Sequence, residues 1–556
     1  MTFTTEAGSI AVALDAACTR LREGHVADAL WTRRVDLWSS DPAVQQTIAN
    51  RLGWLDALET VTPHLSRLRT CAASVRDSGI TDVVLLGMGG SSLAPEVLRA
   101  VIGVAPGFPR FTVLDSVDPD AVRAAMTRPA SSLFVIASKS GSTIEPNALA
   151  AEAIRRLRDA GIETPGSRLI AITDPDTLLC RRATDEQFRD LFINPPDIGG
   201  RFSALSYFGL LPAALMGIDV DVLVGSARTM AEACRLADPR RNPGLALGAF
   251  MAAAAQTGRD KLTLALSSQL EPFGLWIEQL VAESTGKHGT GVIPITGESG
   301  PIPLTGDRAV VRIELVREHP DSDIVEAPSV ADVPHMTIGM HDVQELGAEF
   351  FRWEMATATA GILLAINPFD EPNVQQAKTS TRRLLDTYTT TRRLPLPEPD
   401  AIIHGIRLTL SDAARPALTT EGPLGFLRLL RMNDYVGLLA YLPSDGDTLQ
   451  SLVREFRTAV ATKTNCPTMF GYGPRYLHST GQLHKGGPNT GLFIIVTADV
   501  AQDLAIPDEP YSFGVLELAQ AAGDFDSLAC AGRRVLHAHL PSRELLPLQR
   551  LLTSLI

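Results

Sequence analysis

Cysteine is scarce in this sequence, which has six among its 556 residues. The six lie far apart and never form a Cys-x-x-Cys pair, so we expect neither a disulfide framework nor a cysteine-based metal site. They are Cys18, Cys71, Cys180, Cys234, Cys466 and Cys530. Isolated thiols of this kind are typical of a reducing compartment, which predicts a cytoplasmic protein.

Long apolar runs are also missing. A membrane-spanning helix needs ~18 consecutive apolar residues, and the alanine-rich run Phe250–Ala255 is far shorter. The first ten residues contain Glu6 and no lysine or arginine, so we expect no secretory signal. The sequence therefore predicts no membrane partner.

Positive charge is in deficit, because 50 Lys and Arg stand against 63 Asp and Glu, a net charge of −13. That balance disfavours nucleic acid or an anionic membrane as the main partner, but it allows a local basic pocket for a small anion. Hydrophobic residues make up 45% of the chain, which is typical of a globular protein. The length predicts about three to four domains.

Short apolar runs alternate with helical stretches from about residue 80 onward. Runs that are apolar on both faces are typical of buried parallel strands, and repeated strand–helix units form doubly wound sheets. The strands predicted for a first sheet cover residues 83–86, 111–114, 133–136, 169–172 and 191–193. Further strands are predicted at 261–266, 291–295, 310–315, 436–441 and 492–496.

The predicted fold is α/β, with two doubly wound parallel-sheet αβα sandwich domains and a smaller C-terminal α/β unit. Residues 1–75 form an N-terminal helical segment, with helices expected at 10–21 and 44–58. The two sandwich domains cover 76–220 and 221–392, a proline-rich boundary follows, and the C-terminal unit covers 400–556.

Three loops follow predicted strands of the first sheet, at the end where parallel sheets bind ligands. GMGGSS (87–92) and SKSGST (138–143) lead from a strand into a helix, and their glycines and hydroxyls suit a phosphate monoester. IGGRFS (198–203) places Arg201 near the same edge. Each loop also has a plainer interpretation: a tight turn, a group of helix caps, and an exposed surface arginine.

A predicted helix around residues 276–287 puts Gln279, Glu283 and Lys287 on one face, four residues apart. Glu283 can serve as a base whose pKa is set by burial and by a neighbouring arginine, acting in opposite directions. The alternative is an ordinary solvated face of acidic and basic residues.

Together these motifs resemble the phosphoglucose isomerase family. QLVAESTGK (279–287) and INPFDEPNVQQAK (366–378) complete the likeness, and all five motifs occur in the family's order. Residues 37–56 and 471–491 are similar to the isomerase half of bacterial transaldolase–phosphoglucose isomerase fusions. The resemblance implies sugar-isomerase (SIS-type) domains and the interconversion of glucose 6-phosphate and fructose 6-phosphate through an enediolate, without metal or other cofactor.

The resemblance also implies a role for each matching residue. Glu283 would move a proton between C1 and C2, Arg201 would stabilise the enediolate, and Lys378 would help to open the sugar ring. Gln279 would hydrogen-bond the substrate. The phosphate would be bound by Gly90, Ser91, Ser138, Lys139, Ser140, Ser142 and Thr143.

Two positions depart from the family's pattern. Residues 303–315 lack the histidine that often opens the ring. Asp307 and Arg308 stand nearby, while His288, His335 and His341 are substitutes by position alone. We predict instead that the glycine-rich segment HSTGQLHKGG (478–487), with His478, His484 and Lys485, reaches the active site, or that of a neighbouring subunit, and supplies this acid or base. We place His484 among the catalytic candidates. The alternative is a structural loop.

The second departure is Glu371, where the family often has glutamine. Its charge could tune Lys378 or lie in solvent.

Other functions remain open at this point. One is a sugar-phosphate sensor, which would need no base, and another is an isomerase that also accepts mannose 6-phosphate. The resemblance further implies a homodimer. No transaldolase barrel with its Schiff-base lysine precedes residue 37, so we expect no transaldolase activity, and a separate transaldolase stays open as a partner.

Overall fold

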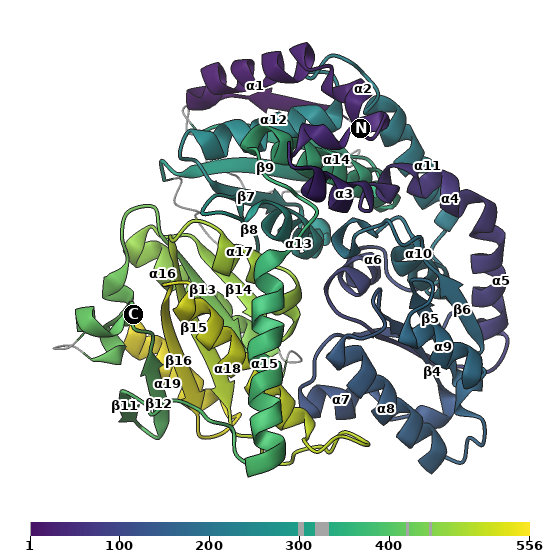
Figure 1. The fold of residues 1–556 in the computed structure, drawn as a ribbon, viewed down its shortest axis with the longest axis vertical. Coiled ribbons are helices and arrows are strands. Elements are labelled where there is room, and N and C mark those ends of the chain that lie inside the picture. The colour runs from purple at the N-terminus through teal and green to yellow at the C-terminus, as the bar shows by residue number, and fades with distance from the viewer. Residues whose placement is uncertain (1, 299–304, 317–332, 419–421, 444–446) are drawn as a thin grey trace.

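The computed structural model describes residues 2–298, 305–316, 333–418, 422–443 and 447–556. Its strands form sheets of five, five and six strands, which lie in three lobes that meet in the middle of the molecule (Figure 1). The first and third sheets fall within the regions predicted at 76–220 and 400–556, and the second within 221–392 apart from one N-terminal strand.

The first sheet is entirely parallel, in the order β3-β2-β4-β5-β6. Its strands are β2 (Asp82–Leu86), β3 (Arg110–Leu114), β4 (Ser132–Ala137), β5 (Leu169–Thr173) and β6 (Asp190–Ile193). Alternate residues of each strand enter two different apolar cores, one on each face. The helices on one face are α5 (Leu65–Arg76), α6 (Leu93–Val101) and α10 (Tyr207–Leu215), and those on the other are α7 (Pro119–Ala125), α8 (Ile144–Asp159) and α9 (Leu178–Asp185). This is the predicted αβα sandwich.

The second sheet has the order β1-β10-β9-β7-β8, and only the edge strand β1 is antiparallel to its neighbour. Its strands are β1 (Thr2–Glu6), β7 (Lys261–Leu266), β8 (Ile293–Ile295), β9 (Arg308–Leu315) and β10 (His335–Met340). The associated helices are α1 (Ala11–Glu23), α2 (Val26–Trp31), α11 (Val220–Ala233), α12 (Pro243–Gln256), α13 (Phe273–Thr285) and α14 (Leu346–Leu364). One apolar core runs from this lobe into the first.

The N-terminal segment differs from its prediction in two places. Residues 2–6 form β1, whose mostly exposed side chains leave no apolar alternation to reveal a strand. The helix predicted at 44–58 is divided into α3 (Pro42–Ala49) and α4 (Ala57–Val61). The break lies at Gly53, whose N–H donates to the Asp197 carbonyl over 3.0 Å and where a Cβ would lie 2.2 Å from that aspartate's carboxylate.

The third sheet has the order β11-β12-β16-β15-β13-β14, with four parallel strands and an antiparallel edge. Its strands are β11 (Ala401–Ile403), β12 (Ile406–Leu410), β13 (Tyr435–Ala440), β14 (Thr468–Tyr472), β15 (Gly491–Ala498) and β16 (Arg534–Leu540). Its helices are α16 (Asp447–Thr464), α17 (Gly481–Gly486), α18 (Phe513–Cys530) and α19 (Leu545–Leu555), and α15 (Pro372–Thr391) packs against α18.

One turn of this C-terminal lobe reaches the first sheet. After β14 the chain forms the 3-10 turn Arg475–His478, hereafter the histidine turn, which contacts the turn Gly89–Ser91 at the end of β2. The three lobes therefore meet beside the carboxyl ends of the first sheet's strands. Across the described ranges no helix is both long and apolar enough to cross a membrane, and all six cysteines are free.

Candidate active site

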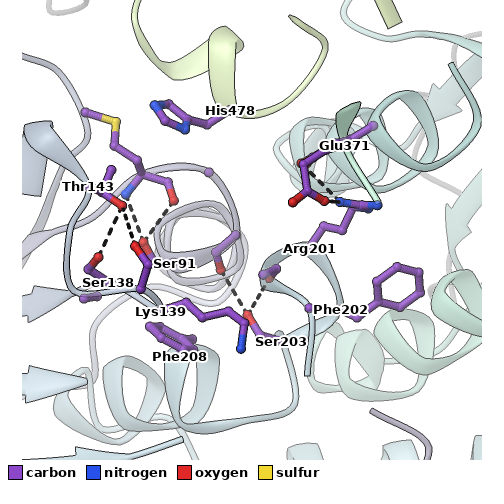
Figure 2. A pocket seen from close by; sticks show the side chains of 18 of the residues that line it. Ser91, Ser138, Lys139, Thr143, Arg201, Phe202, Ser203, Phe208, Glu371 and His478 are labelled. Atoms are coloured by element: carbon purple, nitrogen blue, oxygen red, sulfur yellow. Dashed lines mark hydrogen bonds and ion pairs between the residues drawn. The ribbon is translucent and has the colours of Figure 1, made fainter. Parts of the chain in front are cut away.

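A cavity of about 410 Å³ lies where the carboxyl ends of the first sheet's strands meet α13, α15 and the histidine turn. Figure 2 shows Ser138 and Thr143 on one side of it, Arg201 and Glu371 on the other, and His478 above them. The predicted residues that line it are Gly90, Ser91, Ser138, Lys139, Ser140, Thr143, Arg201, Gln279, Glu283 and Lys378. Motifs that are far apart in the sequence thus meet at one site.

The hydroxyl loop, residues 138–143, connects β4 to α8. Thr143 is the N-cap residue of α8, but its side chain does not cap the helix. Its Oγ1 instead accepts a hydrogen bond from Ser138 Oγ at 3.3 Å and lies 3.5 Å from Ser140 Oγ. The structure therefore argues against the helix-capping interpretation. The hydroxyls gather before an uncapped helix N-terminus, whose N–H groups and dipole favour an anion such as a phosphate monoester.

The glycine turn Gly89–Ser91 is shaped by close packing. The Ser91 hydroxyl stays within the turn, accepting from the Met88 N–H and donating to the Met88 carbonyl, both over 2.9 Å. A Cβ at Gly90 would lie 2.1 Å from the Gly200 carbonyl oxygen. Glycine is required there because only a bare backbone allows the loop that carries Arg201 to approach the end of β2.

Two predicted phosphate ligands have other surroundings. Lys139 lines the cavity, but its Nζ pairs with the Asp174 carboxylate and donates to the Pro196 carbonyl over 2.8 Å. Ser142 does not line this cavity, and that prediction is corrected: it follows Gly141, where a φ of +65° turns the chain, and lines a neighbouring cavity of about 840 Å³.

Gln279 and Glu283 lie one turn apart on α13, and both are buried. Gln279 Nε2 donates to Glu283 Oε2 over 3.2 Å, and Gln279 Oε1 has no partner among the described residues. Burial raises the pKa of Glu283 above that of an ordinary glutamate, while the Arg201 guanidinium, 3.1 Å away, acts in the opposite direction. The alternative of a solvated charged face is excluded. Glu283 has the surroundings of a buried general base.

Arg201 is not a surface arginine, since its side chain is 4% exposed. Its Nε donates to Ser284 Oγ over 2.8 Å, and its Nη2 donates to two carbonyl oxygens of the segment 366–371 at 2.7 and 2.9 Å. Its Nη1 lies 3.1 Å from a carboxylate oxygen of both Glu283 and Glu371. A cation held this firmly can stabilise negative charge that develops beside Glu283.

Lys287 lies beyond the end of α13 and supports the same segment. Its Nζ donates to the Asn367 carbonyl over 2.6 Å and pairs with the Asp370 carboxylate at 2.7 Å. Burial lowers the pKa of Lys287 to about 8. Lys287 therefore holds the segment 366–371 against Arg201 and does not line the cavity.

Lys378 lines the cavity from α15, and it is exposed. Glu371 pairs with Arg201, so its charge does not act primarily on Lys378. After burial, which is the main cause, the charge of Glu371 further raises the pKa of Glu283.

The two histidines of the glycine-rich segment have opposite surroundings. His478 lines the cavity, and its Nε2 lies 2.8 Å from Glu145 Oε1. His484 is buried beside the rings of Tyr435, Tyr476 and Phe493, away from the cavity. Burial lowers the pKa of His484 well below its usual value, so its ring stays neutral. The prediction that His484 lies at the site was wrong, because the apolar packing of α17 buries this side chain in the core. The prediction that the segment 478–487 reaches the cavity is confirmed through His478.

Glu145 is a buried member of the site that the sequence motifs did not identify. Burial acts to raise the pKa of Glu145, but His478, the backbone N–H of Glu145 and the Gln520 amide together outweigh it, and the pKa lies below the ordinary value. Gln520 Nε2 also donates to Glu145 Oε1, over 2.7 Å. An ionised carboxylate only accepts hydrogen bonds, so His478 Nε2 must carry a proton. The other ring nitrogen, Nδ1, is then the one available for proton exchange. The only sequence signal was a carboxylate in the first turn of α8.

Within the part of the chain that the structure describes, none of the residues considered in place of the ring-opening histidine lines the cavity. Arg308 pairs with Glu298 at 2.6 Å and Asp307 faces Lys261 at 3.4 Å, while His288, His335 and His341 lie elsewhere. Arg51, from the N-terminal segment, is a lining residue that the sequence did not indicate. Within the described ranges no three His, Cys, Asp or Glu side chains are grouped to hold a metal ion.

Comparison with known proteins agrees with this geometry. The family model for phosphoglucose isomerase matches residues 57–309. Glucose-6-phosphate isomerase of Rubrobacter xylanophilus is 31% identical over 375 residues, 57% of this chain and 85% of that protein. The enzyme of the same name from Parasynechococcus marenigrum is 30% identical over 384 residues, 61% of this chain and 69% of that protein.

A solved structure, that of a hypothetical protein from Thermus thermophilus, superposes with a TM-score of 0.57 at 26% identity, covering 69% of this chain and 99% of that one. The matching relatives, the shared motifs and the cavity in which those motifs meet lead to one conclusion: the chain belongs to the phosphoglucose isomerase family.

Proposed function

We propose that this chain interconverts glucose 6-phosphate and fructose 6-phosphate by proton transfer in the 410 Å³ cavity. The observation that carries the proposal is the pair of Glu283 and Arg201, 3.1 Å apart and buried in the same cavity as the hydroxyl loop. Aldose–ketose isomerisation needs a base at C1 and C2 and a cation for the oxygen that becomes negative. A sensor that only binds sugar phosphate has no use for this pair.

The phosphate is assigned to the hydroxyl loop. Ser138, Ser140 and Thr143 would donate to its oxygens, and the uncapped N-terminus of α8 would add favourable charge. Neutral hydroxyl donors hold a dianion without an ion pair that would slow its release. With the phosphate there, the other end of a hexose extends toward α13.

The proton transfer is assigned to Glu283. Its carboxylate would take the proton from C2 of the open-chain aldose and return it to C1, while Arg201 stabilises the enediolate between the two steps. Gln279 Oε1, which lacks a partner among the described residues, would accept a hydrogen bond from a substrate hydroxyl. Because burial raises the pKa of Glu283, the carboxylate is a stronger base than an exposed glutamate.

Ring opening is assigned to His478 and Lys378, which face the cavity from the C-terminal lobe and α15. Opening breaks the bond between the ring oxygen and the anomeric carbon, adds a proton to that oxygen and removes one from the anomeric hydroxyl. Two groups able to hydrogen-bond or exchange protons are therefore needed. The ionised Glu145 would orient the imidazole of His478 through its contact with Nε2.

Association into a homodimer and with a separate transaldolase remain predictions of the sequence. Neither is needed to bring base, arginine, lysine and histidine together, because all four meet within one chain. We propose the cytoplasm as its location, where both sugar phosphates would occur and free thiols stay reduced.

The test is a coupled assay on fructose 6-phosphate with Glu283→Gln and Glu278→Gln. Both residues are buried on α13, but Glu278 lines a different cavity. A general base contributes about 10²–10⁴-fold, so Glu283→Gln should lose that factor in kcat and Glu278→Gln should stay within a few-fold of wild type. Equal loss in both variants, or none in Glu283→Gln, would contradict the assignment.

A further inference from the structure

We propose that the ion pair between Arg475 and Asp115 is a positioning device that holds His478 in the active cavity. The inference rests on the proposed role of His478 in ring opening. Arg475 opens the histidine turn, three residues before His478. Its guanidinium binds the carboxylate in a bidentate manner, with Nε–Oδ2 at 2.7 Å and Nη2–Oδ1 at 2.8 Å. Such a planar pair fixes direction as well as distance.

Asp115 connects this arginine to the phosphate side of the site. It follows β3 directly and is buried. Ser92 Oγ lies 3.2 Å from Asp115 Oδ2 and 3.2 Å from the Gly89 carbonyl oxygen, and its single O–H can donate to either of them. One carboxylate therefore joins the start of the histidine turn to the glycine turn beside the hydroxyl loop.

Other contacts fix the end of the turn. Gln279 Nε2 donates to the His478 carbonyl over 2.7 Å, and Glu145 holds the imidazole. At Gly89 a Cβ would lie 2.5 Å from the same carbonyl, so the two turns are in close contact. The C-terminal lobe anchors the middle of the histidine turn through the buried Tyr476, whose hydroxyl donates to Asp524 Oδ2 over 2.7 Å. Restraint at both of its ends is what can define where His478 lies relative to substrate.

A second arginine of the same lobe provides a natural control. Arg543 binds the neighbouring carboxylate of Asp118 and lies 2.9 Å from both Asp120 and Glu517. It joins the C-terminal lobe to the same loop after β3, but it lies far along the chain from the histidine turn. Arg543 therefore contributes to lobe docking alone, whereas Arg475 contributes to docking and to the placement of His478.

The experiment compares fructose 6-phosphate with 5-deoxyfructose 6-phosphate, which lacks the hydroxyl that closes the ring and stays open. A misplacement of about 1 Å can cost ~10²-fold in rate, so Arg475→Lys should lower kcat/KM on fructose 6-phosphate by about tenfold or more. On the open analogue the change should stay below about twofold. Asp115→Asn, which keeps the shape of the side chain, should show the same split. Arg543→Lys should change both substrates equally or neither.

His478→Asn is measured beside these variants to separate the two hypotheses. If it shows no selective loss on fructose 6-phosphate, the ring-opening role of His478 is wrong. If it does show that loss while Arg475→Lys and Asp115→Asn affect both substrates alike, or neither, the positioning role of the ion pair is wrong. Should Arg475→Lys fail to fold, the result with Asp115→Asn decides.

Discussion

The hydroxyl loop and the histidine turn reach the same cavity by different routes. The hydroxyl loop is local: its residues are consecutive, they follow one buried strand, and the helix after them supplies the favourable dipole. The histidine turn belongs to the third sheet, and its place depends on Asp115, Glu145 and Gln279 of the other lobes. The arrangement of the hydroxyl loop follows from its local sequence, whereas the position of the histidine turn depends on tertiary contacts.

This difference separates the chemical steps. In the proposed function, the loops of the first sheet and α13 would contribute to binding and proton transfer for any form of the substrate. The histidine turn would matter only while the sugar ring is closed. Variants of the two regions should therefore differ in how they treat fructose 6-phosphate and an analogue that cannot close its ring.

The largest effect after loss of the base is expected at Arg201. Arg201→Met removes the cation beside Glu283, and loss of such charge stabilisation typically costs about 10²–10³-fold in kcat. The cyclic and the open substrate should lose equally, because both pass through the enediolate. Steady-state kinetics on both substrates measures this, with Arg383→Met, an exposed arginine, as the control. A loss limited to the cyclic substrate would place Arg201 in ring opening.

The next effect is expected at the two histidines. His478→Asn should lower kcat/KM on fructose 6-phosphate by about 10–100-fold, within the range for a general acid or base, and leave the open analogue nearly unchanged. His484→Leu should leave the activity per folded molecule on both substrates near wild type, since that ring lies among aromatic side chains. If His484→Leu selectively lowered activity on fructose 6-phosphate, then His484 and not His478 would act in ring opening.

A smaller effect is expected in the hydroxyl loop. Thr143→Val removes one donor to the phosphate, and a hydrogen bond to a charged group contributes about 1.5–3 kcal/mol, so KM should rise roughly 10-fold or more at similar kcat. Ser142→Ala is the matched control and should leave KM within about twofold, because Ser142 faces the neighbouring cavity. Measurement of KM for both variants decides whether the two hydroxyls differ as described.

The smallest effect is a shift in pH dependence at Glu371. Its negative charge adds to burial in raising the pKa of Glu283, so Glu371→Gln should lower that pKa. The base is then deprotonated at lower pH, and the acidic limb of kcat/KM against pH should move to lower pH. A limb that stays in place or moves upward would show that Glu371 does not act on Glu283.

Much of the fold was predictable because buried parallel strands are apolar on both faces. The strand predicted at 261–266 is β7 without change, and the five predicted strands of the first sheet all exist. The edge strand β1 escaped prediction because most of its side chains are exposed. The break at Gly53 depends on Asp197, a partner far along the chain that periodicity does not reveal.

The same limit applies to the site. Glu283 and Arg201 could be found because their motifs lie within short segments of the sequence. Glu145, Arg475 and the choice between His478 and His484 depend on which lobe packs against which, and local sequence carries little information about that. Buried carboxylates in the first turn of a helix after a hydroxyl-rich loop are a signal worth testing in other sequences.

The central claim is that Glu283 moves a proton between C1 and C2 of the substrate, and exchange with solvent tests it most directly. Fructose 6-phosphate is incubated with wild type and with Glu283→Gln in D₂O, and the products are followed by proton NMR. We predict deuterium at C2 of glucose 6-phosphate and at C1 of fructose 6-phosphate with wild type, and its loss with Glu283→Gln. Exchange at the wild-type rate in Glu283→Gln would contradict the account.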